Sequence, residues 1–171
     1  MPEDRETAKD FIEAGGLFFL AHRLRRLSDG LVTDCEQWFV EAGIRVPPRT
    51  TSILYLLEND GPQRITAIAS TLRQFHPVVV DWVRKLKKLG FLATTVDPAD
   101  RRCTIVCLTA SGRKEVAKIR QAETAITAAY STLEKENGAS LIEGVAVWES
   151  ALSQKSLFIR INEYSLLLDG S

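Results

Sequence analysis

The sequence contains few of the residues that build metal, redox or nucleophilic sites. Among 171 residues there are three cysteines, two histidines and one methionine. Cys35, Cys103 and Cys107 show no close metal-ligand spacing, and their odd number argues against a secreted disulfide framework. On a predicted strand, Cys103 and Cys107 would lie about 13 Å apart, too far for an intrachain disulfide. We expect reduced thiols, with a redox switch as the less favoured alternative.

Patterns typical of enzymes and membrane proteins are also absent. There is no glycine-rich phosphate loop, and neither His22 nor His76 lies near a nucleophile motif, so we expect no catalysis, no metal and no cofactor. The longest apolar runs, at 16–21 and 165–168, are far shorter than the roughly 20 residues of a membrane span. The start, residues 1–10, is strongly charged and acidic, unlike a signal peptide. These features predict a cytoplasmic protein without a membrane partner.

The chain has no overall excess of either charge. Its 22 basic residues balance 22 acidic ones, but the two kinds are unevenly distributed. The net charge is −3 over residues 1–48, +7 over 49–120 and −4 over 121–171. A basic middle between acidic ends is expected when only one part of a protein binds phosphates. A solvated helix face is the alternative explanation.

Long amphipathic patterns are present on both sides of the basic middle. Apolar residues recur at three- and four-residue steps over 17–40, and again over 109–137 and 140–168, where the last series begins with a Ser-x-x-Glu capping box. Such helices carry more apolar surface than one small domain can cover. We therefore expect one domain over 1–171, with helices within 11–43 and 110–168 forming a homodimer interface.

Two short helices joined by a turn are predicted before Gly90. Thr66 is expected to cap the first helix, which continues at helical spacing. Pro77 suits the first turn of the second helix, with Phe75 or His76 just before it. Gly90 supplies the left-handed residue that ends this helix.

A β-hairpin is predicted after these helices. The β-branched residues favour strands at 91–96 and 103–108, joined by a turn at Asp97-Pro98. Thr109 is expected to cap the next helix. Helix, helix, hairpin and helix is the order of a winged helix-turn-helix, with its core at 49–112. The predicted fold is mainly α with a small β-hairpin, a winged helix-turn-helix on a long-helix dimerisation scaffold.

Two stretches of this segment resemble a known family. They are Asp97-Pro98-Ala99-Asp100-Arg101-Arg102 and Leu108-Thr109-Ala110-Ser111-Gly112. Together they resemble the MarR family of winged-helix transcriptional regulators, and the resemblance extends loosely over most of the chain from about Gly16. It implies an obligate homodimer that binds palindromic operators in double-stranded DNA. It also implies that a small aromatic effector or an oxidant often weakens DNA binding.

The second helix of the pair is the predicted recognition helix. In such modules its N-terminal and outward residues face base edges in the major groove. The residues expected there are Phe75, His76, Pro77, Val80 and Asp81. The family commonly has Ser or Thr and then Arg where this chain has Val80 and Asp81. A carboxylate is repelled by phosphates but accepts a hydrogen bond from cytosine, and Val80 can contact a thymine methyl. Altered specificity, weak binding and loss of specific binding all remain open.

Phosphate contacts are expected from polar residues around the recognition helix. The candidates are Arg73, Gln74, Arg84, Lys85 and Lys88, with Arg49 and Thr51 as weaker ones. Such contacts supply affinity without sequence information.

The predicted wing has its own candidate contacts. Arg101 is expected to enter the minor groove, where the negative potential of a narrow groove favours an arginine, and Asp100 is expected to orient it. Arg102 is expected to pair within the domain. A surface hairpin stabilised by an Asp-Arg pair is the alternative.

The effector site is the least defined part of the sequence. His22, Trp38 and Tyr55 are candidate ligand-pocket residues, with ordinary packing as the alternative. The main hypothesis is a homodimeric DNA-binding regulator. The alternative is a degenerate winged-helix protein-interaction module that has lost operator readout, and salt-dependent binding to duplex DNA distinguishes the two.

Overall fold

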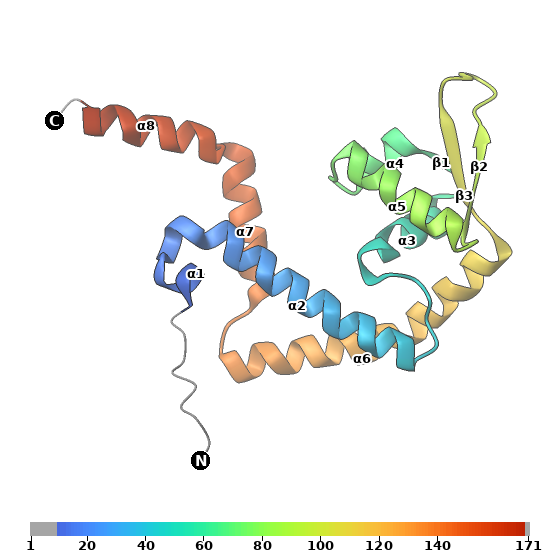
Figure 1. Cartoon of the computed structure of the whole chain (residues 1–171), viewed down its shortest axis with the longest axis horizontal. Coiled ribbons are helices and arrows are strands. Elements are labelled where there is room, and N and C mark those ends of the chain that lie inside the picture. The colour runs from blue at the N-terminus through green and yellow to red at the C-terminus, as the bar shows by residue number, and fades with distance from the viewer. Residues whose placement is uncertain (1–9, 170–171) are drawn as a thin grey trace, which may run out of the picture. The chain divides into compact units, whose positions relative to one another are not determined.

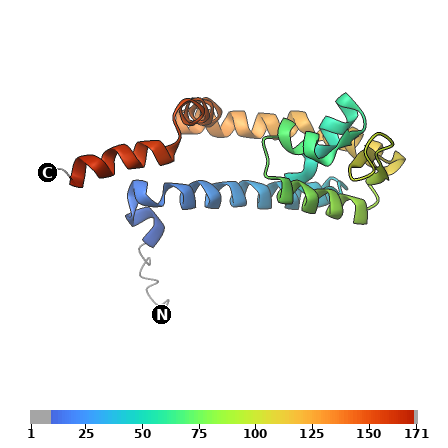
Figure 2. The ribbon, with the colours of Figure 1, turned by 90° about the horizontal axis from the view of Figure 1, so that it is seen from above.

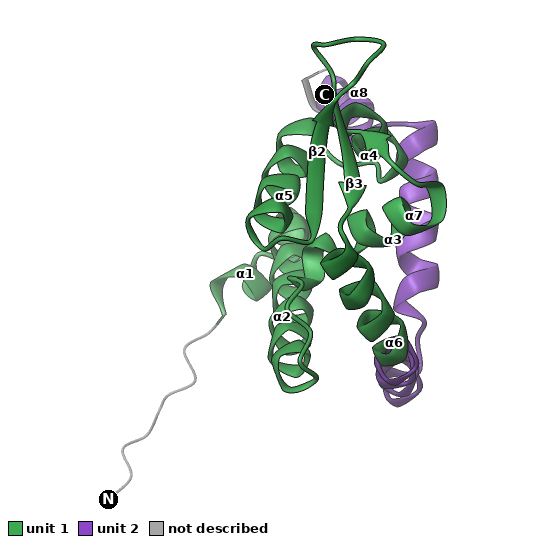
Figure 3. Cartoon of the chain, turned by 90° about the vertical axis from the view of Figure 1, so that its right-hand side faces the viewer, with its two compact units in different colours: residues 1–122 green, residues 123–171 purple. Residues whose placement is uncertain are grey.

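The computed structural model describes residues 10–169, and the chain divides into two units between Ala122 and Glu123 (Figure 3). The helical elements of the first unit are α1 (Phe11–Ala14), the 3-10 turn η1 (Gly16–Phe19), α2 (Leu20–Glu41), the 3-10 turn η2 (Pro48–Thr50), α3 (Thr51–Asp60), α4 (Ile65–Thr71) and α5 (His76–Lys88). Helix α6 (Ala110–Asn137) crosses the boundary, and α7 (Leu141–Gln154) and α8 (Leu157–Asp169) follow (Figure 1). Within the described residues, no helix is both long and apolar enough to cross a membrane.

A small antiparallel sheet joins the helices of the first unit. Its strands are β1 (Gln63–Arg64), β2 (Leu92–Val96) and β3 (Thr104–Leu108), in the order β1-β3-β2. The hairpin of β2 and β3 has Leu92 opposite Leu108 and Val96 opposite Thr104. Its tip projects beyond the helices around it (Figure 1). The predicted fold class is confirmed, and the two-residue strand β1 is an addition that the sequence did not indicate.

Helices α3, α4 and α5 enclose the core with the sheet. Its fully buried side chains include Ile53, Leu54, Ile68, Leu86 and Phe91. They come from three helices and the start of the wing, so the winged segment folds around one apolar centre. Burying an aliphatic or aromatic side chain of this size contributes about 1.5–3 kcal/mol.

The start of α4 differs from the sequence-based expectation. Arg64, not Thr66, is the N-cap residue, and no side chain caps the helix. The reason is tertiary, because Arg64 is the last residue of β1 and pairs with Ile105 of β3. The chain therefore passes directly from a strand into the helix, and Thr66 lies inside the first turn.

The boundaries of α5 and α6 follow the predicted caps. Phe75 is the N-cap residue of α5, with Pro77 in the first turn, and Gly90 just after the helix has φ 79°. Thr109 precedes α6, where its hydroxyl accepts a hydrogen bond from the Gly112 amide at 3.0 Å. The same hydroxyl donates to the Gly90 carbonyl at 2.7 Å, so the end of α5 and the start of α6 are tied together.

A buried carboxylate ties the loop after α2 to α6. Glu115 is 2% exposed and accepts a hydrogen bond from the Arg45 amide at 2.8 Å and from the Lys118 ammonium at 2.9 Å. Lys118 also donates to the Gly43 carbonyl at 2.7 Å. Burial by itself would raise the pKa of Glu115, but the Arg45 amide and the Lys118 ammonium more than offset this and lower it. Glu115 therefore holds the loop as a charged group.

Both long helical patterns at the chain ends are interrupted. The N-terminal series, predicted from residue 17, begins in η1, and α2 itself starts only at Leu20 and then runs as one continuous helix (Figure 2). The C-terminal series, expected as one helix, breaks between α7 and α8. Lys155 is extended there, and the Ser156 hydroxyl accepts a hydrogen bond from the Ile159 amide as a new cap. The predicted cap Ser140 is confirmed by its bond from the Glu143 amide.

Candidate nucleic-acid interface

Helix α5 has one buried face and one exposed, mainly cationic face. Val79, Val83 and Leu86 are buried against the core. With 3.6 residues per turn, the opposite side is occupied by one row of residues. This row consists of Pro77, Asp81, Arg84 and Lys88, all exposed, and Lys85 lies exposed beside it. The predicted recognition helix thus presents its charged residues to solvent, while Val80 on its flank is only partly exposed.

The turn between α4 and α5 is unusual in its backbone. Arg73 has φ 51°, a left-handed conformation that costs a non-glycine residue roughly 1–2 kcal/mol. The Gln74 amide donates to the Ala69 carbonyl at 3.0 Å, which holds the turn. Arg73, Gln74 and His76 are exposed, and the ring of Phe75 is 82% exposed. The structure therefore brings these predicted contacts together at the exposed start of α5.

A salt bridge lies in the middle of the exposed face of α5. Arg84 Nη1 and Asp81 Oδ1 are 2.7 Å apart, and their side chains are 73% and 67% exposed. The carboxylate that departs from the family pattern is thus paired with a predicted phosphate contact. This pairing neutralises part of the positive charge on the helix.

One cation of α5 belongs to the wing and not to the exposed face. Lys87 Nζ donates to Thr94 Oγ1 at 2.7 Å, which links the end of α5 to β2. Sequence spacing alone groups Lys87 with its basic neighbours. Only the position of β2 shows that it holds the wing against the helix.

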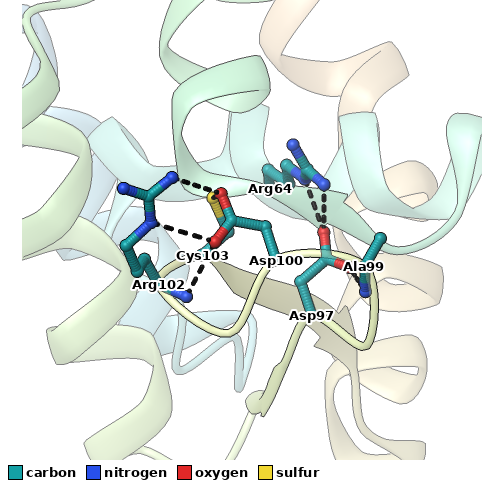
Figure 4. A network of polar contacts seen from close by, with 6 residues as sticks. All are labelled: Arg64, Asp97, Ala99, Asp100, Arg102 and Cys103. Atoms are coloured by element: carbon teal, nitrogen blue, oxygen red, sulfur yellow. Dashed lines mark hydrogen bonds and ion pairs between the residues drawn. The ribbon is translucent and has the colours of Figure 1, made fainter.

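The turn between β2 and β3 is held by a charged contact (Figure 4). Asp97 is buried, and its Oδ2 accepts from Arg64 Nε at 2.5 Å, while its Oδ1 accepts from the Ala99 amide at 2.8 Å. The Ala99 amide and the Arg64 guanidinium lower the pKa of Asp97. The carboxylate therefore fixes the turn after β2 and joins it to β1. Spacing did not indicate this role for Arg64, since β1 was not predicted.

The tip of the wing differs in one respect from the expectation. Asp100 accepts hydrogen bonds from the Arg102 amide at 3.1 Å and from Arg102 Nε at 3.2 Å, and not from Arg101 (Figure 4). These contacts with Arg102 lower the pKa of Asp100. The expected pairing of Arg102 within the domain is confirmed, but Asp100 orients Arg102 instead of Arg101. Arg101 is exposed and has no hydrogen-bond or ion-pair partner among residues 10–169.

The weaker phosphate candidates have partners within the chain. Arg49 forms a salt bridge with Asp29 of α2, and the hydroxyl of Thr51 donates to the Pro48 carbonyl at 2.9 Å. Both groups would have to exchange these partners for a phosphate.

The three candidate pocket residues do not meet in one chain. His22 and Trp38 lie 16 residues apart on α2, a rise of about 24 Å. His22 packs edge-on against Phe19, and Tyr55 lies beneath the guanidinium of Arg120, 4.9 Å from its ring centre. None of the three lines the cleft of about 220 Å³ at the end of α2, which lies between Glu36 and Pro47.

Two of the three cysteines, Cys103 and Cys107, lie in the hairpin. Cys35, Cys103 and Cys107 are all partly exposed. Cys103 Sγ lies 3.5 Å from Asp100 Oδ2 at the wing tip, and Cys107 Sγ lies 3.7 Å from the Ala93 carbonyl oxygen.

The turn, the exposed face of α5 and the hairpin together define a winged helix-turn-helix protein. Residues 47–104 match the model of the MarR family, which is roughly a third of the chain and includes α3, α4, α5 and most of the hairpin. This segment is therefore similar to the MarR family of winged-helix transcriptional regulators, as the resemblance implied.

Three solved structures have the same fold. The transcriptional repressor CouR bound to a 23-mer DNA duplex is 25% identical, with a TM-score of 0.61 over 76% of this chain and 92% of that one. MepR of S. aureus in a DNA complex is 22% identical, with a TM-score of 0.60 over 79% and 97%. BpsR of Bordetella bronchiseptica is 24% identical, with a TM-score of 0.55 over 78% and 96%. No curated protein matches the chain significantly in sequence.

Proposed function

We propose that the chain acts as a homodimer that binds a palindromic operator in double-stranded DNA through α5 and the wing. One observation supports this proposal most directly: the exposed face of α5 carries three cations, and the described wing exposes Arg101 without a partner. These cations of α5 are Arg84, Lys85 and Lys88. Exposed cations supply phosphate affinity, while an arginine at a wing tip suits a narrow minor groove. DNA binding also agrees with the cytoplasmic location expected from the sequence.

The comparison with CouR supports this proposal. That repressor is described in complex with a DNA duplex. The structural match extends over 92% of its chain. A palindromic operator follows from two-fold symmetry, because two identical recognition helices in a dimer read two inverted half-sites.

The test is selection from a randomised duplex library at two salt concentrations. Wild-type protein is expected to enrich a palindrome and to bind more weakly as salt rises, since binding releases counterions from neutralised phosphates. Arg101→Ala should lower affinity for the selected site by about tenfold, the scale of one good groove contact.

The matched control is Arg102→Ala, which removes a neighbouring arginine already bound to Asp100. It should lower affinity less than Arg101→Ala. Failure to enrich any motif, with weak binding that Arg101→Ala leaves unchanged, would reject operator binding. It would favour the alternative of a winged-helix protein-interaction module.

We further propose that a small aromatic effector modulates DNA binding. BpsR is described as regulated in its DNA binding by 6-hydroxynicotinic acid, and PcaV of Streptomyces coelicolor is described in complex with its natural ligand. His22, Trp38 and Tyr55 are the proposed contacts, and the partner chain would have to help bring them together. Quenching of tryptophan fluorescence by hydroxylated aromatic acids, lost in Trp38→Phe, tests this part. Unchanged quenching in that variant would reject Trp38 as a contact.

A further inference from the structure

The outward row of α5 has an unusual composition for a DNA-facing surface. Its members Pro77, Asp81, Arg84 and Lys88 lie opposite the buried Val79, Val83 and Leu86. A carboxylate in such a row is repelled by phosphates. Asp81 therefore lowers the general affinity for DNA unless it makes a favourable contact of its own.

Stability does not account for Asp81. Its carboxylate bonds to Arg84 Nη1 at 2.7 Å, but both side chains are about two-thirds or more exposed. An exposed ion pair three residues apart on a helix contributes little to folding. The pair does hold one acceptor and one donor side by side on the outer surface of the helix.

We propose that the Asp81–Arg84 pair reads one C·G base pair in each half-site, with Asp81 accepting from cytosine N4 and Arg84 donating to guanine O6 and N7. This inference rests on the proposed binding of duplex DNA by α5. In the major groove a C·G pair presents the N4 donor of cytosine beside the O6 and N7 acceptors of guanine. In the Asp81–Arg84 pair, the acceptor Oδ1 and the donor Nη1 lie side by side, 2.7 Å apart.

The carboxylate also discriminates against the other bases. Opposite thymine O4 or guanine O6, the Asp81 carboxylate would face another hydrogen-bond acceptor. This is unfavourable because the carboxylate would lose its water without gaining a donor. Beside adenine the N6 donor is available, but the neighbouring N7 lone pair repels the second carboxylate oxygen. Cytosine carries only the donor at this edge, so it is the base that the carboxylate selects.

The test compares base preference in full-length wild-type protein and in variants of the pair. Duplexes from the selection, altered one base pair at a time, are titrated by fluorescence anisotropy. Wild-type protein should lose about tenfold in affinity when one C·G pair per half-site becomes T·A. Asp81→Ala should reduce this ratio to near one and bind unrelated DNA several-fold more tightly, because it removes a negative charge.

Asp81→Asn provides a gain of specificity that misfolding cannot mimic. An asparagine forms paired hydrogen bonds with adenine N6 and N7, so preference at this position should move from cytosine to adenine. Lys85→Ala is the matched control on the same helix. It should weaken binding to all sequences by a similar factor and keep the cytosine preference.

The outcomes separate this inference from the proposed function. If wild-type protein shows no salt-dependent DNA binding, both are rejected. If it selects a palindrome and Asp81→Ala keeps every base preference, or weakens all sequences equally, only the reading of C·G by this pair is rejected. The reading of C·G is supported if one operator position loses its cytosine preference in Asp81→Ala and prefers adenine in Asp81→Asn.

Discussion

Arg73 shows how one residue can combine strain with a predicted contact. Its left-handed φ of 51° is a conformation that glycine adopts without penalty. Here an arginine occupies the turn that precedes α5. The proposed phosphate contact gives a reason for keeping an arginine where glycine would be less strained.

Arg73→Gly should therefore stabilise the fold while weakening DNA binding. Relief of the left-handed strain, less the added chain entropy of glycine, should raise the free energy of unfolding by about 0.5–1 kcal/mol. Urea denaturation measures this change, and anisotropy should show a severalfold lower affinity for DNA. Arg73→Ala is the control, since it removes the charge but keeps the strain. If both variants have the same stability, the strain at this turn is negligible.

The close approach of α6 to the wing depends on a residue without a side chain. Gly112 lies in the first turn of α6, and a Cβ there would come within 2.2 Å of the Phe91 carbonyl oxygen and 3.1 Å of Leu108 Cδ2. A backbone atom cannot move aside as a flexible side chain can. The glycine of the family-like stretch at 108–112 thus permits the packing of α6 against Phe91, just before β2, and Leu108 at the end of β3.

Gly112→Ala should therefore destabilise the protein by about 1–3 kcal/mol or more, the usual range for overpacking. Thermal unfolding followed by circular dichroism measures the loss. Gly30→Ala on α2 is the matched control, because nothing lies within 4 Å of its added Cβ. There the better helix propensity of alanine should stabilise by about 0.5–1 kcal/mol. Equal effects of the two substitutions would contradict the proposed close contact.

The second unit exposes most of its apolar residues. Over residues 141–167 no described side chain is buried, and Trp148 and Phe158 are 56% and 73% exposed. Isolated proteins rarely leave so many large apolar side chains of one segment in water. A second copy of the chain is the proposed cover, in line with the homodimer expected from the helical patterns.

Phe158→Glu in α8 should shift the protein from dimer to monomer. A carboxylate buried in an apolar interface is costly, so the dimer dissociation constant should rise at least about tenfold. Sedimentation equilibrium measures this constant, and affinity for a palindrome should fall in parallel. Glu163→Gln, at an exposed polar position five residues on and so on another side of the helix, should leave the dimer intact. A monomeric wild-type protein at micromolar concentration would contradict the proposed assembly.

Element types and caps could largely be predicted because they depend on neighbours in sequence. Pro77 and Gly90 delimit α5, and Thr109 begins α6, through local backbone geometry. The break at Ser156 was missed because the apolar spacing continues across it. The error at Thr66 has another cause, since the start of α4 depends on β1 pairing with a strand about 40 residues later.

Helix periodicity and the positions of glycine and proline were sufficient to predict the winged fold from the sequence, and the charge distribution indicated its basic segment. Only the tertiary structure showed which hydrogen-bond and ion-pair partner each charged side chain has. Asp100 bonds to Arg102 and leaves Arg101 exposed, Lys87 joins the wing, and Asp81 pairs with Arg84. Backbone patterns are set by short-range sterics and hydrogen bonding, whereas a charged side chain with several neighbours in reach finds its partner only when tertiary packing places them.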